Sequence, residues 1–273
     1  MRNANAEKAV ILARGLGTRM RKEDASVALD ESQAAIAASG VKAMLRIKRP
    51  FLDYVLHVLA DAGYHDVCLV IGPEHTQVRD YYEGLKSQRV RISFAIQEKP
   101  LGTANAVAAA ESFAGKSSIL VLNSDNFYPQ DACAGLRGLS GSGFAAFERD
   151  SLIRGSNIPA ERIMKFAAAE IGADGLLKRI LEKPDEATLA RLGTPLYVSM
   201  NCWMFRPVIF EACRKIGLSP RGEYEVTDAV QYAIDHLHEP FHAVKTYSPV
   251  LDLSSRNDIA GVTQRLSDME VNL

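Results

Sequence analysis

The chain has 273 residues, 47% of them hydrophobic, which is enough for one large α/β domain or for two lobes. Its formal net charge of −1 gives no electrostatic reason to expect nucleic acid or a membrane surface as a partner, so the substrate should be small. The four cysteines form no C-x-x-C pair, which favours reduced thiols over a zinc site or disulfides. No targeting segment or bilayer-spanning run is present, so we expect a cytoplasmic protein.

Strands and helices alternate in the first half of the chain. The apolar runs that predict strands cover residues 9–13, 67–71, 91–95 and 118–122. The helical patterns between them cover residues 50–62, 76–86 and 103–112. This alternation predicts an α/β fold with a mainly parallel sheet wrapped by helices.

After about residue 140 the alternation loosens. Residues 166–171 and 176–181 flank Ala173-Asp174-Gly175, which predicts a hairpin, and short strands are expected around 196–205 and 241–247. The second half is therefore predicted to be a mixed α+β lobe. Without an internal repeat or linker, residues 1–273 should form one domain, with halves of about 1–135 and 136–273 sharing a cleft.

A glycine turn, Gly15-Leu16-Gly17-Thr18-Arg19, follows the first strand. Its glycines let the main chain approach an anion, and its N–H groups and the Arg19 guanidinium are donors suited to phosphate. The alternative is a turn that only redirects the chain. Met20 breaks a dinucleotide-binding fingerprint, and the sequence lacks the Gly-Lys-Ser/Thr of a P-loop.

The polar, alanine-rich residues 24–40 form an insertion after this turn, with a helix expected at 34–38. A surface loop with a short helix is favoured over a lid on an active site.

Further short motifs follow along the chain: LARGLGTRM at 12–20, KAML at 42–45, QEKPLGTA at 97–104, LNSDN at 122–126, EKP at 182–184, and LDL at 251–253 with Asp258 beyond it. In this order and spacing they resemble the sugar-1-phosphate nucleotidyltransferase (NDP-sugar pyrophosphorylase) family over almost the whole chain. The resemblance implies a Rossmann-like, glycosyltransferase-A-like fold, with a nucleotide-binding first half and a sugar-phosphate-binding second half. It also implies transfer of a nucleoside monophosphate from an NTP to a sugar-1-phosphate or cyclitol phosphate, with release of pyrophosphate.

The resemblance assigns the charged side chains to substrate phosphates and to a metal. The catalytic cations would be Arg19 and Lys42 on the triphosphate and Lys183 on the phosphate of the sugar substrate. Asp125 and Asp252 would hold Mg²⁺, which suits one or two carboxylates plus substrate oxygens. The alternatives are solvated surface charges for the lysines and a strand-end cap for Asp125.

The same resemblance assigns the binding of the base and the sugar. Glu182 and Asn201 would bind sugar hydroxyls. The nucleotide would contact Leu12, Ala13, Gly15, Gly17, Thr18, Gln97, Gly102 and Thr103. A glutamine amide can accept from an N–H and donate to the carbonyl beside it, a pair that uracil, thymine and guanine present and adenine and cytosine do not. We therefore expect GTP, UTP or dTTP as the NTP; a homo-oligomer is compatible with the sequence.

Several residues depart from the family pattern. Arg14 stands where the family usually has a small residue, and Val41 and Arg46 replace prolines on either side of the lysine motif. Asn201 lacks the glycine usually found two residues later, because Trp203 stands there. Trp203 would either stack on the sugar or, more commonly for a lone tryptophan, lie in the core.

The segment 222–228 should cap and support a helix at the base of the sugar lobe, with Thr227 or Asp228 as the cap. A metal-dependent glycosyltransferase of similar fold and a non-catalytic nucleotide-sugar-binding regulator are the alternative functions. The absence of hexapeptide repeats predicts no acyltransferase domain within the 273 residues.

Overall fold

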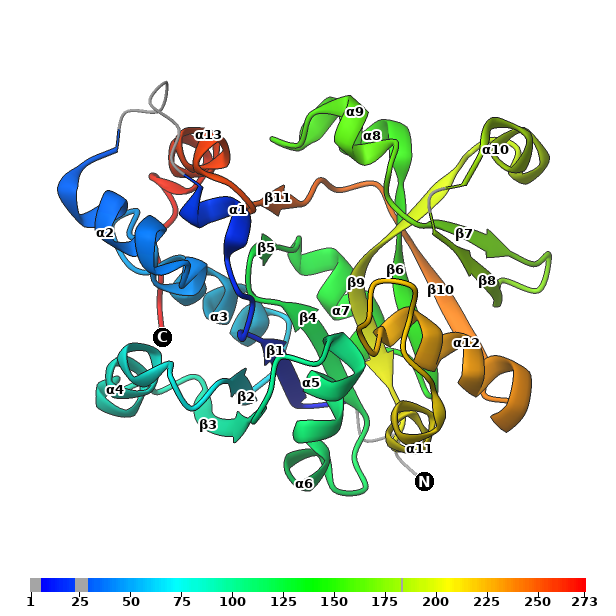
Figure 1. Ribbon diagram of the computed structural model, residues 1–273, viewed down its shortest axis with the longest axis horizontal. Helices are drawn as coiled ribbons and strands as arrows, with labels where there is room; N and C mark the ends of the chain where they lie inside the picture. Colours follow the sequence, from blue (N-terminus) through cyan, green and yellow to red (C-terminus); the bar gives the residue numbers. More distant parts are fainter. Residues whose placement is uncertain (1–5, 23–28, 183) are drawn as a thin grey trace.

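The computed structural model describes residues 6–22, 29–182 and 184–273. A twisted sheet runs through the centre, and helices lie on both of its faces (Figure 1). The strands of this sheet are β1 (Lys8–Leu12), β2 (Asp66–Ile71), β3 (Arg91–Ile96), β4 (Ile119–Asn123), β6 (Ser142–Glu148), β7 (Ala168–Ile171), β8 (Leu177–Leu181), β9 (Tyr197–Phe205) and β10 (Phe241–Thr246). A separate ribbon pairs β5 (Asn126–Phe127) with β11 (Leu251–Asp252).

The strand order is β10-β6-β9-β4-β1-β2-β3, with β7 beside β9 and β8. Strands β1 to β4 pair in parallel, whereas β9 runs antiparallel to both β4 and β6. The sheet therefore continues from the first half of the chain into the second. The predicted mixed, mainly parallel sheet wrapped by helices is what the chain forms.

The described helices are α1 (Thr18–Arg21), α2 (Glu31–Ser39), α3 (Phe51–Asp61), α4 (Thr76–Gly84), α5 (Thr103–Ala109), α6 (Glu111–Ala114), α7 (Gln130–Arg137), α8 (Arg149–Gly155), α9 (Ala160–Ile163), α10 (Glu186–Leu192), α11 (Val208–Lys215), α12 (Val226–Leu237) and α13 (Arg256–Leu266). A 3₁₀ turn covers Lys42–Met44. None of the helices in the described ranges is long and apolar enough to cross a membrane.

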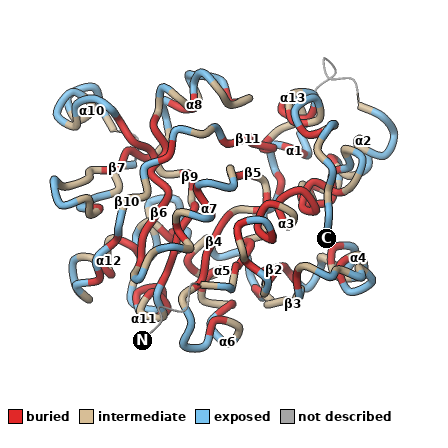
Figure 2. Tube along the Cα trace, turned by 180° about the vertical axis from the view of Figure 1, so that it is seen from behind, coloured by how far each residue is buried: buried red, intermediate tan, exposed pale blue. Residues whose placement is uncertain are grey.

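Along the central strands both faces of the sheet are buried, as their near-continuous apolar runs require. Along β1, Ala9 and Ile11 pack into one core cluster and Val10 into another, because successive side chains point to opposite faces. Helices α3, α7 and α13 contribute to the first cluster, and α5, α11 and α12 to the second. Figure 2 shows the buried strands at the centre and the exposed outer surfaces of the helices around them.

Local details differ from the sequence-based expectations at several points. The helix expected at 103–112 is two helices that break at the buried Ala110, where φ and ψ are −90° and 5°. The apolar pattern continues across the break and so did not reveal it. Strand β6 was not predicted, because all seven of its residues are buried and it shows no alternation.

The predicted cap of the helix after residue 222 was wrong. Helix α12 begins at Val226, with Glu225 at the N-cap position and no side-chain cap. Thr103 Oγ1, from another segment, accepts a hydrogen bond from the Val226 N–H at 2.8 Å. A tertiary contact has therefore replaced the local cap that the sequence suggested.

Trp203 lies in the core, fully buried. Its ring stacks on Phe205 at 5.8 Å between centroids with an interplanar angle of 10°, and Phe144 lies 5.4 Å away. Of the two alternatives for Trp203, the structure shows the core position, which is the commoner one for a lone tryptophan.

Replacing Trp203 with alanine should lower the free energy of unfolding by about 3–5 kcal/mol, because it removes a large side chain from a packed aromatic cluster. Urea unfolding followed by far-UV circular dichroism measures this change without relying on tryptophan fluorescence. As a control, Leu218→Ala should change little, since Leu218 is 59% exposed. Near-normal stability of Trp203→Ala combined with weaker sugar-phosphate binding would contradict a purely structural role.

Candidate active site

Two adjoining pockets open beside the carboxyl ends of β1 and β4, where open α/β sheets bind ligands. We call the one of about 460 Å³ the turn pocket, because the glycine turn lines it, and the one of about 310 Å³ the lobe pocket, because the second half of the chain supplies most of its lining. Arg19, Asn123 and Asp125 line both. The two pockets therefore meet at a cation and a carboxylate.

The glycine turn supplies main-chain donors to the turn pocket. Gly17 has a φ of 61°, and a Cβ there would lie 2.3 Å from the carbonyl oxygen of Gly40, so only glycine fits. No described residue accepts a hydrogen bond from the N–H groups of Gly15, Leu16 or Gly17. The Arg19 side chain is exposed and pairs with no described residue. The turn thus presents unpaired donors next to a cation.

The insertion packs against this turn. Helix α2 begins with a capping box formed by Asp30 and Gln33 and ends at Gly40, and Arg21 of α1 donates to the Ser39 carbonyl at 2.7 and 3.0 Å. Gly40 and Val41 line the turn pocket. Residues 24–28 lie outside the described residues. The helix of the insertion is longer than the expected 34–38, and it supports the glycine turn.

Gln97 lies buried at the other end of the turn pocket. Its Nε2 donates to the Gly102 carbonyl at 3.0 Å and to Asn105 Oδ1 at 2.9 Å. Because a main-chain carbonyl can only accept, this contact fixes which amide atom is the nitrogen. Both amide donors are therefore used within the protein, and Oε1 is the atom left to accept a hydrogen bond.

The loop that follows Gln97 is joined to the second half of the chain. Tyr224 N–H donates to the Leu101 carbonyl at 2.8 Å, and Ala104 N–H donates to the Tyr224 carbonyl at 2.8 Å. Gly102 adopts a φ of 118°, and a Cβ there would lie 2.5 Å from the Tyr224 carbonyl oxygen. The close approach of these two loops requires glycine at this position.

The ribbon brings Asp125 and Asp252 together. Asn126 of β5 pairs with Asp252 of β11, and Leu253 N–H donates to the Asp125 carbonyl at 2.8 Å. Asn126 Nδ2 also donates to Asp252 Oδ1 at 2.9 Å. Main-chain pairing between residues more than a hundred positions apart therefore fixes the spacing of the two carboxylates.

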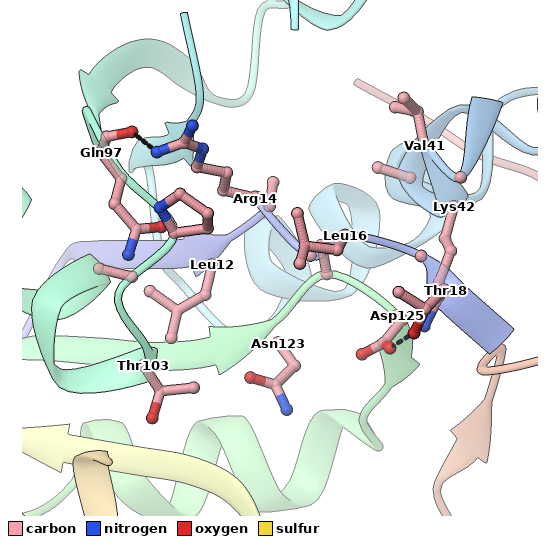
Figure 3. A pocket seen from close by; sticks show the side chains of 18 of the residues that line it. Leu12, Arg14, Leu16, Thr18, Val41, Lys42, Gln97, Thr103, Asn123 and Asp125 are labelled. Atoms are coloured by element: carbon pink, nitrogen blue, oxygen red, sulfur yellow. Dashed lines mark hydrogen bonds and ion pairs between the residues drawn. The ribbon is translucent and has the colours of Figure 1, made fainter. Parts of the chain in front are cut away.

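Each carboxylate has its own cation. Lys42 Nζ lies 2.7 Å from Asp125 Oδ2, and the two side chains point toward one another (Figure 3). Arg162 of α9 pairs with Asp252 and also with Asp258 at 3.4 Å. Burial raises the pKa of Asp252 to about 6, and the charge of Asp125 adds to this shift while Arg162 opposes it. Asp125 and Asp252 together thus concentrate negative charge, which Lys42 and Arg162 compensate in this structure.

The lobe pocket contains the predicted sugar-binding residues. Glu182 is exposed on its wall, and Asn201 has a φ of 55°, a left-handed conformation that asparagine tolerates better than most residues. Asn201 Oδ1 accepts from Trp203 Nε1 at 3.4 Å. The left-handed backbone at Asn201 lies where the register between β6 and β9 shifts. Asn201 therefore departs from the regular alternation of side chains between the two faces of the sheet.

A family model described as nucleotidyl transferase matches residues 8–248. The chain belongs to this family. It is 30% identical over 231 residues to a glucose-1-phosphate thymidylyltransferase of Streptomyces griseus, covering 84% of this chain and 57% of that protein. It is 24% identical over 261 residues to the UTP–glucose-1-phosphate uridylyltransferase AglF of Haloferax volcanii, covering 96% of this chain and 97% of that protein. The chain spans only 47–59% of the length of the S. griseus protein and of several other curated relatives that it matches.

Solved structures confirm the predicted fold class. A UDP-glucose pyrophosphorylase in complex with UDP-glucose superposes with a TM-score of 0.73 at 19% identity, covering 97% of this chain and all of that one. A UDP-glucose pyrophosphorylase from Acinetobacter baumannii has a TM-score of 0.71 at 16% identity, with 97% and 95% covered. At these identities the likeness establishes the fold.

The structure gathers the described residues that the family resemblance selects. The turn pocket is lined by the expected nucleotide residues and by Lys42: Leu12, Ala13, Gly15, Gly17, Thr18, Lys42, Gln97, Gly102 and Thr103. Glu182, Asn201 and Asp252 line the lobe pocket, while Arg19 and Asp125 line both. Lys183 lies outside the described residues. The roles of all these residues stay predictions.

Sequence reasoning missed two arginines of the lobe pocket, Arg162 and Arg221. Arg221 immediately precedes the segment 222–228 that the sequence did single out, and its Nη2 lies 2.7 Å from Glu225 Oε1. That adjacency was a usable signal. Arg162 lies in a four-residue helix outside the motifs, and only the fold brings it to Asp252.

Replacing Asp125 with asparagine should lower the pKa of Asp252 from about 6, because one of the two nearby negative charges that disfavour its ionised form is removed. The pKa should stay above the ordinary value of 3.8, since burial remains its largest cause. Carbon-13 NMR of labelled aspartate carboxyls against pH measures it, with Asp174→Asn on the exposed hairpin as the control. An unchanged Asp252 titration in Asp125→Asn would contradict the coupling.

Proposed function

We propose that this chain transfers a nucleoside monophosphate from an NTP to a sugar-1-phosphate or cyclitol phosphate, forming an NDP-sugar and pyrophosphate. The observation that carries this proposal is the meeting of the turn pocket and the lobe pocket at Arg19 and Asp125. A reaction between two anionic substrates needs two pockets that share a charged junction. Membership of the nucleotidyl transferase family supports the same reaction class.

The chemistry needs positioning and charge more than it needs a protein nucleophile. An oxygen of the sugar phosphate attacks the α-phosphorus of the NTP, the bond to the β-phosphate oxygen breaks, and pyrophosphate leaves. A phosphate monoester has its second pKa at about 6, so the attacking group is already largely dianionic at neutral pH. The protein must hold two polyanions in line and neutralise the charge on the leaving group.

In this proposal the turn pocket binds the NTP. The unpaired N–H groups of the glycine turn and the Arg19 guanidinium hold the triphosphate, and Lys42 reaches the α-phosphate from its place beside Asp125. Gln97 lies at the opposite end of the pocket, where the base would bind. The nucleotide would thus extend from Gln97 to the junction.

The lobe pocket binds the second substrate in this proposal. Glu182 would accept hydrogen bonds from ring hydroxyls, and the Asn201 amide could accept from or donate to them. By the family resemblance, Lys183 would hold the phosphate. The names of relatives that act on glucose-1-phosphate make that compound the first sugar phosphate to test.

Asp125 and Asp252 fit a Mg²⁺ site completed by substrate. Within the described ranges, no group of three or more His, Cys, Asp or Glu residues could hold a metal ion. Two carboxylates nevertheless suit Mg²⁺, which usually binds through one or two carboxylates plus substrate phosphates. Bound there, the ion would neutralise charge on the phosphates. Lys42 and Arg162 now pair with these carboxylates, and with the ion bound they would be released to contact the substrates.

A matrix assay tests the proposal directly. Each of ATP, CTP, GTP, UTP and dTTP is combined with glucose-1-phosphate and with other sugar-1-phosphates in Mg²⁺ buffer, and pyrophosphate release is measured. We expect release with GTP, UTP or dTTP that depends on the sugar phosphate. Glycosyl transfer from an NDP-sugar without pyrophosphate release would instead indicate a glycosyltransferase, and nucleotide-sugar binding without turnover would indicate a regulator.

Replacing Asp125 or Asp252 with alanine should lower kcat about a hundredfold or more, because charge stabilisation of the transition state is lost. Steady-state kinetics in Mg²⁺ measure the change, and the exposed Asp174→Ala variant is the control. Full activity of either active-site variant in EDTA would contradict the metal assignment.

The two phosphate-binding cations should separate by substrate. Arg19→Ala should weaken use of the NTP most, whereas Lys183→Ala should mainly raise KM for the sugar phosphate, because each is assigned to a different anion. Kinetics with each substrate varied in turn distinguish the two, with the exposed Lys116→Ala variant as control. Equal losses for both substrates in both variants would show that the roles are not divided.

A further inference from the structure

Arg14 occupies the base end of the turn pocket, at the first position after the apolar strand residues Leu12 and Ala13. Its side chain is only 7% exposed, so its charge requires partners. Glu74 supplies one: Nε lies 3.1 Å from Oε1 and Nη2 lies 3.2 Å from Oε2. Arg14 Nη1 also donates to the Gln97 carbonyl, as the dashed line in Figure 3 marks. Arg14 and Gln97 are therefore direct neighbours.

The surroundings of Arg14 hold the guanidinium in a fixed position. Gly72 follows β2, and a Cβ there would lie 2.4 Å from Arg14 Nε, so the absence of a side chain leaves space for the guanidinium. The double contact with Glu74 sets the plane of the guanidinium, as paired Arg–carboxylate contacts do. A donor group held in this way can recognise a ligand without first reorganising.

The donor and acceptor inventory at this end of the pocket is unequal. Both amide N–H groups of Gln97 are used by Gly102 and Asn105, so its side chain offers an acceptor alone. The guanidinium of Arg14 has five N–H donors, of which its hydrogen bonds to described residues use three. Arg14 is thus a neighbouring side chain with two donors to spare.

We propose that Arg14 is a base-specificity residue, donating to a base carbonyl oxygen while Gln97 Oε1 accepts from the adjacent ring N–H. This inference rests on the proposed function and assigns the donor half of base recognition to Arg14 in place of the Gln97 amide. The ligand class is a nucleobase with a ring N–H beside a carbonyl, as in uracil, thymine and guanine. Adenine and cytosine present an amino group and a bare ring nitrogen there, which leaves donors facing a donor and an acceptor facing a lone pair.

The experiment measures NTP binding alone, by isothermal titration calorimetry in Mg²⁺ without sugar phosphate. The unmodified protein, Arg14→Gln and the control Arg79→Ala are titrated with UTP, dTTP, GTP, ATP and CTP. Arg79 is a matched control because it lies on the neighbouring helix α4, over the Phe94 ring and outside the lining of the turn pocket. Thermal melting confirms that each variant is folded.

Arg14→Gln should weaken binding of the preferred NTP about 5- to 100-fold, the loss expected for one unmade hydrogen bond at a buried site. Its affinities for ATP and CTP should change less than about threefold, so the preference among bases flattens. Arg79→Ala should keep both affinity and preference. An equal loss for all five NTPs in Arg14→Gln would overturn the proposal and leave Arg14 as a structural link between strand ends.

A second measurement tests the proposal first in the unmodified protein and then in the variant. Sulfur is a weaker acceptor than oxygen, and the ring N–H of uracil has a carbonyl on each side. The unmodified protein should therefore bind 4-thio-UTP or 2-thio-UTP more weakly than UTP, or 6-thio-GTP more weakly than GTP if guanine is preferred. Arg14→Gln should bind each pair alike, as a double-mutant cycle requires when the two groups touch. Equal binding of UTP and both of its thio analogues, or of GTP and 6-thio-GTP, by the unmodified protein would overturn the proposal. Absence of any NTP binding would overturn the proposed function as well, which separates the two failures.

Discussion

The two-stranded ribbon between β5 and β11 is the constraint on which the rest of the site depends. Asp125 and Asp252 come from distant parts of the sequence, and two carboxylates held close together repel one another. Main-chain hydrogen bonds fix their spacing, Asn126 and Ser254 donate to Asp252, and Lys42 and Arg162 supply positive charge. Negative charge at the junction of the two pockets suits the proposed binding of a metal ion between the carboxylates and phosphate oxygens.

Close approaches of main chain, each requiring glycine, connect the segments around that junction. Gly17 lies against Gly40, which ties the glycine turn to the end of α2. Gly102 lies against Tyr224, which ties the loop after Gln97 to the second half of the chain. The central sheet is shared as well, since β9 of the second half pairs directly with β4 of the first. The two pockets are therefore set relative to one another by backbone contacts more than by flexible side chains.

The sequence predicted the fold class and the gathering of the motifs well, because both rest on strong local signals. Buried parallel strands appear in the sequence as apolar runs with helical patterns between them. Asp125 and the glycine turn each follow such a run, so they were expected at the carboxyl ends of the strands, where open α/β sheets bind ligands. The sequence did less well where tertiary contact overrides a local pattern. Thr103 replaces the expected cap of α12, and Ala110 breaks a helix whose apolar periodicity is uninterrupted.

The sequence could not predict which side chains pair with one another, because those contacts depend on how the chain folds. Nothing local to Arg162 indicates that its guanidinium meets Asp252, 90 residues away. Gly102 and Asn105 lie only five and eight residues after Gln97, but the sequence does not show that the loop folds back to bring them to its amide donors. The sequence identified Arg14 only as a departure from a motif. Its contacts with Glu74 and Gln97 in the structure suggested a chemical role for it. The sequence thus identified the groups, and the fold decided which of them are already paired.

The most direct test of the account is a crystal structure of the protein with Mn²⁺, a non-hydrolysable NTP analogue and glucose-1-phosphate, in which anomalous scattering locates the ion. The account predicts the ion between Asp125 and Asp252, with the triphosphate against the glycine turn, the base beside Gln97, and the sugar phosphate in the lobe pocket. An ion bound away from these two carboxylates, with the nucleotide outside the turn pocket, would contradict it.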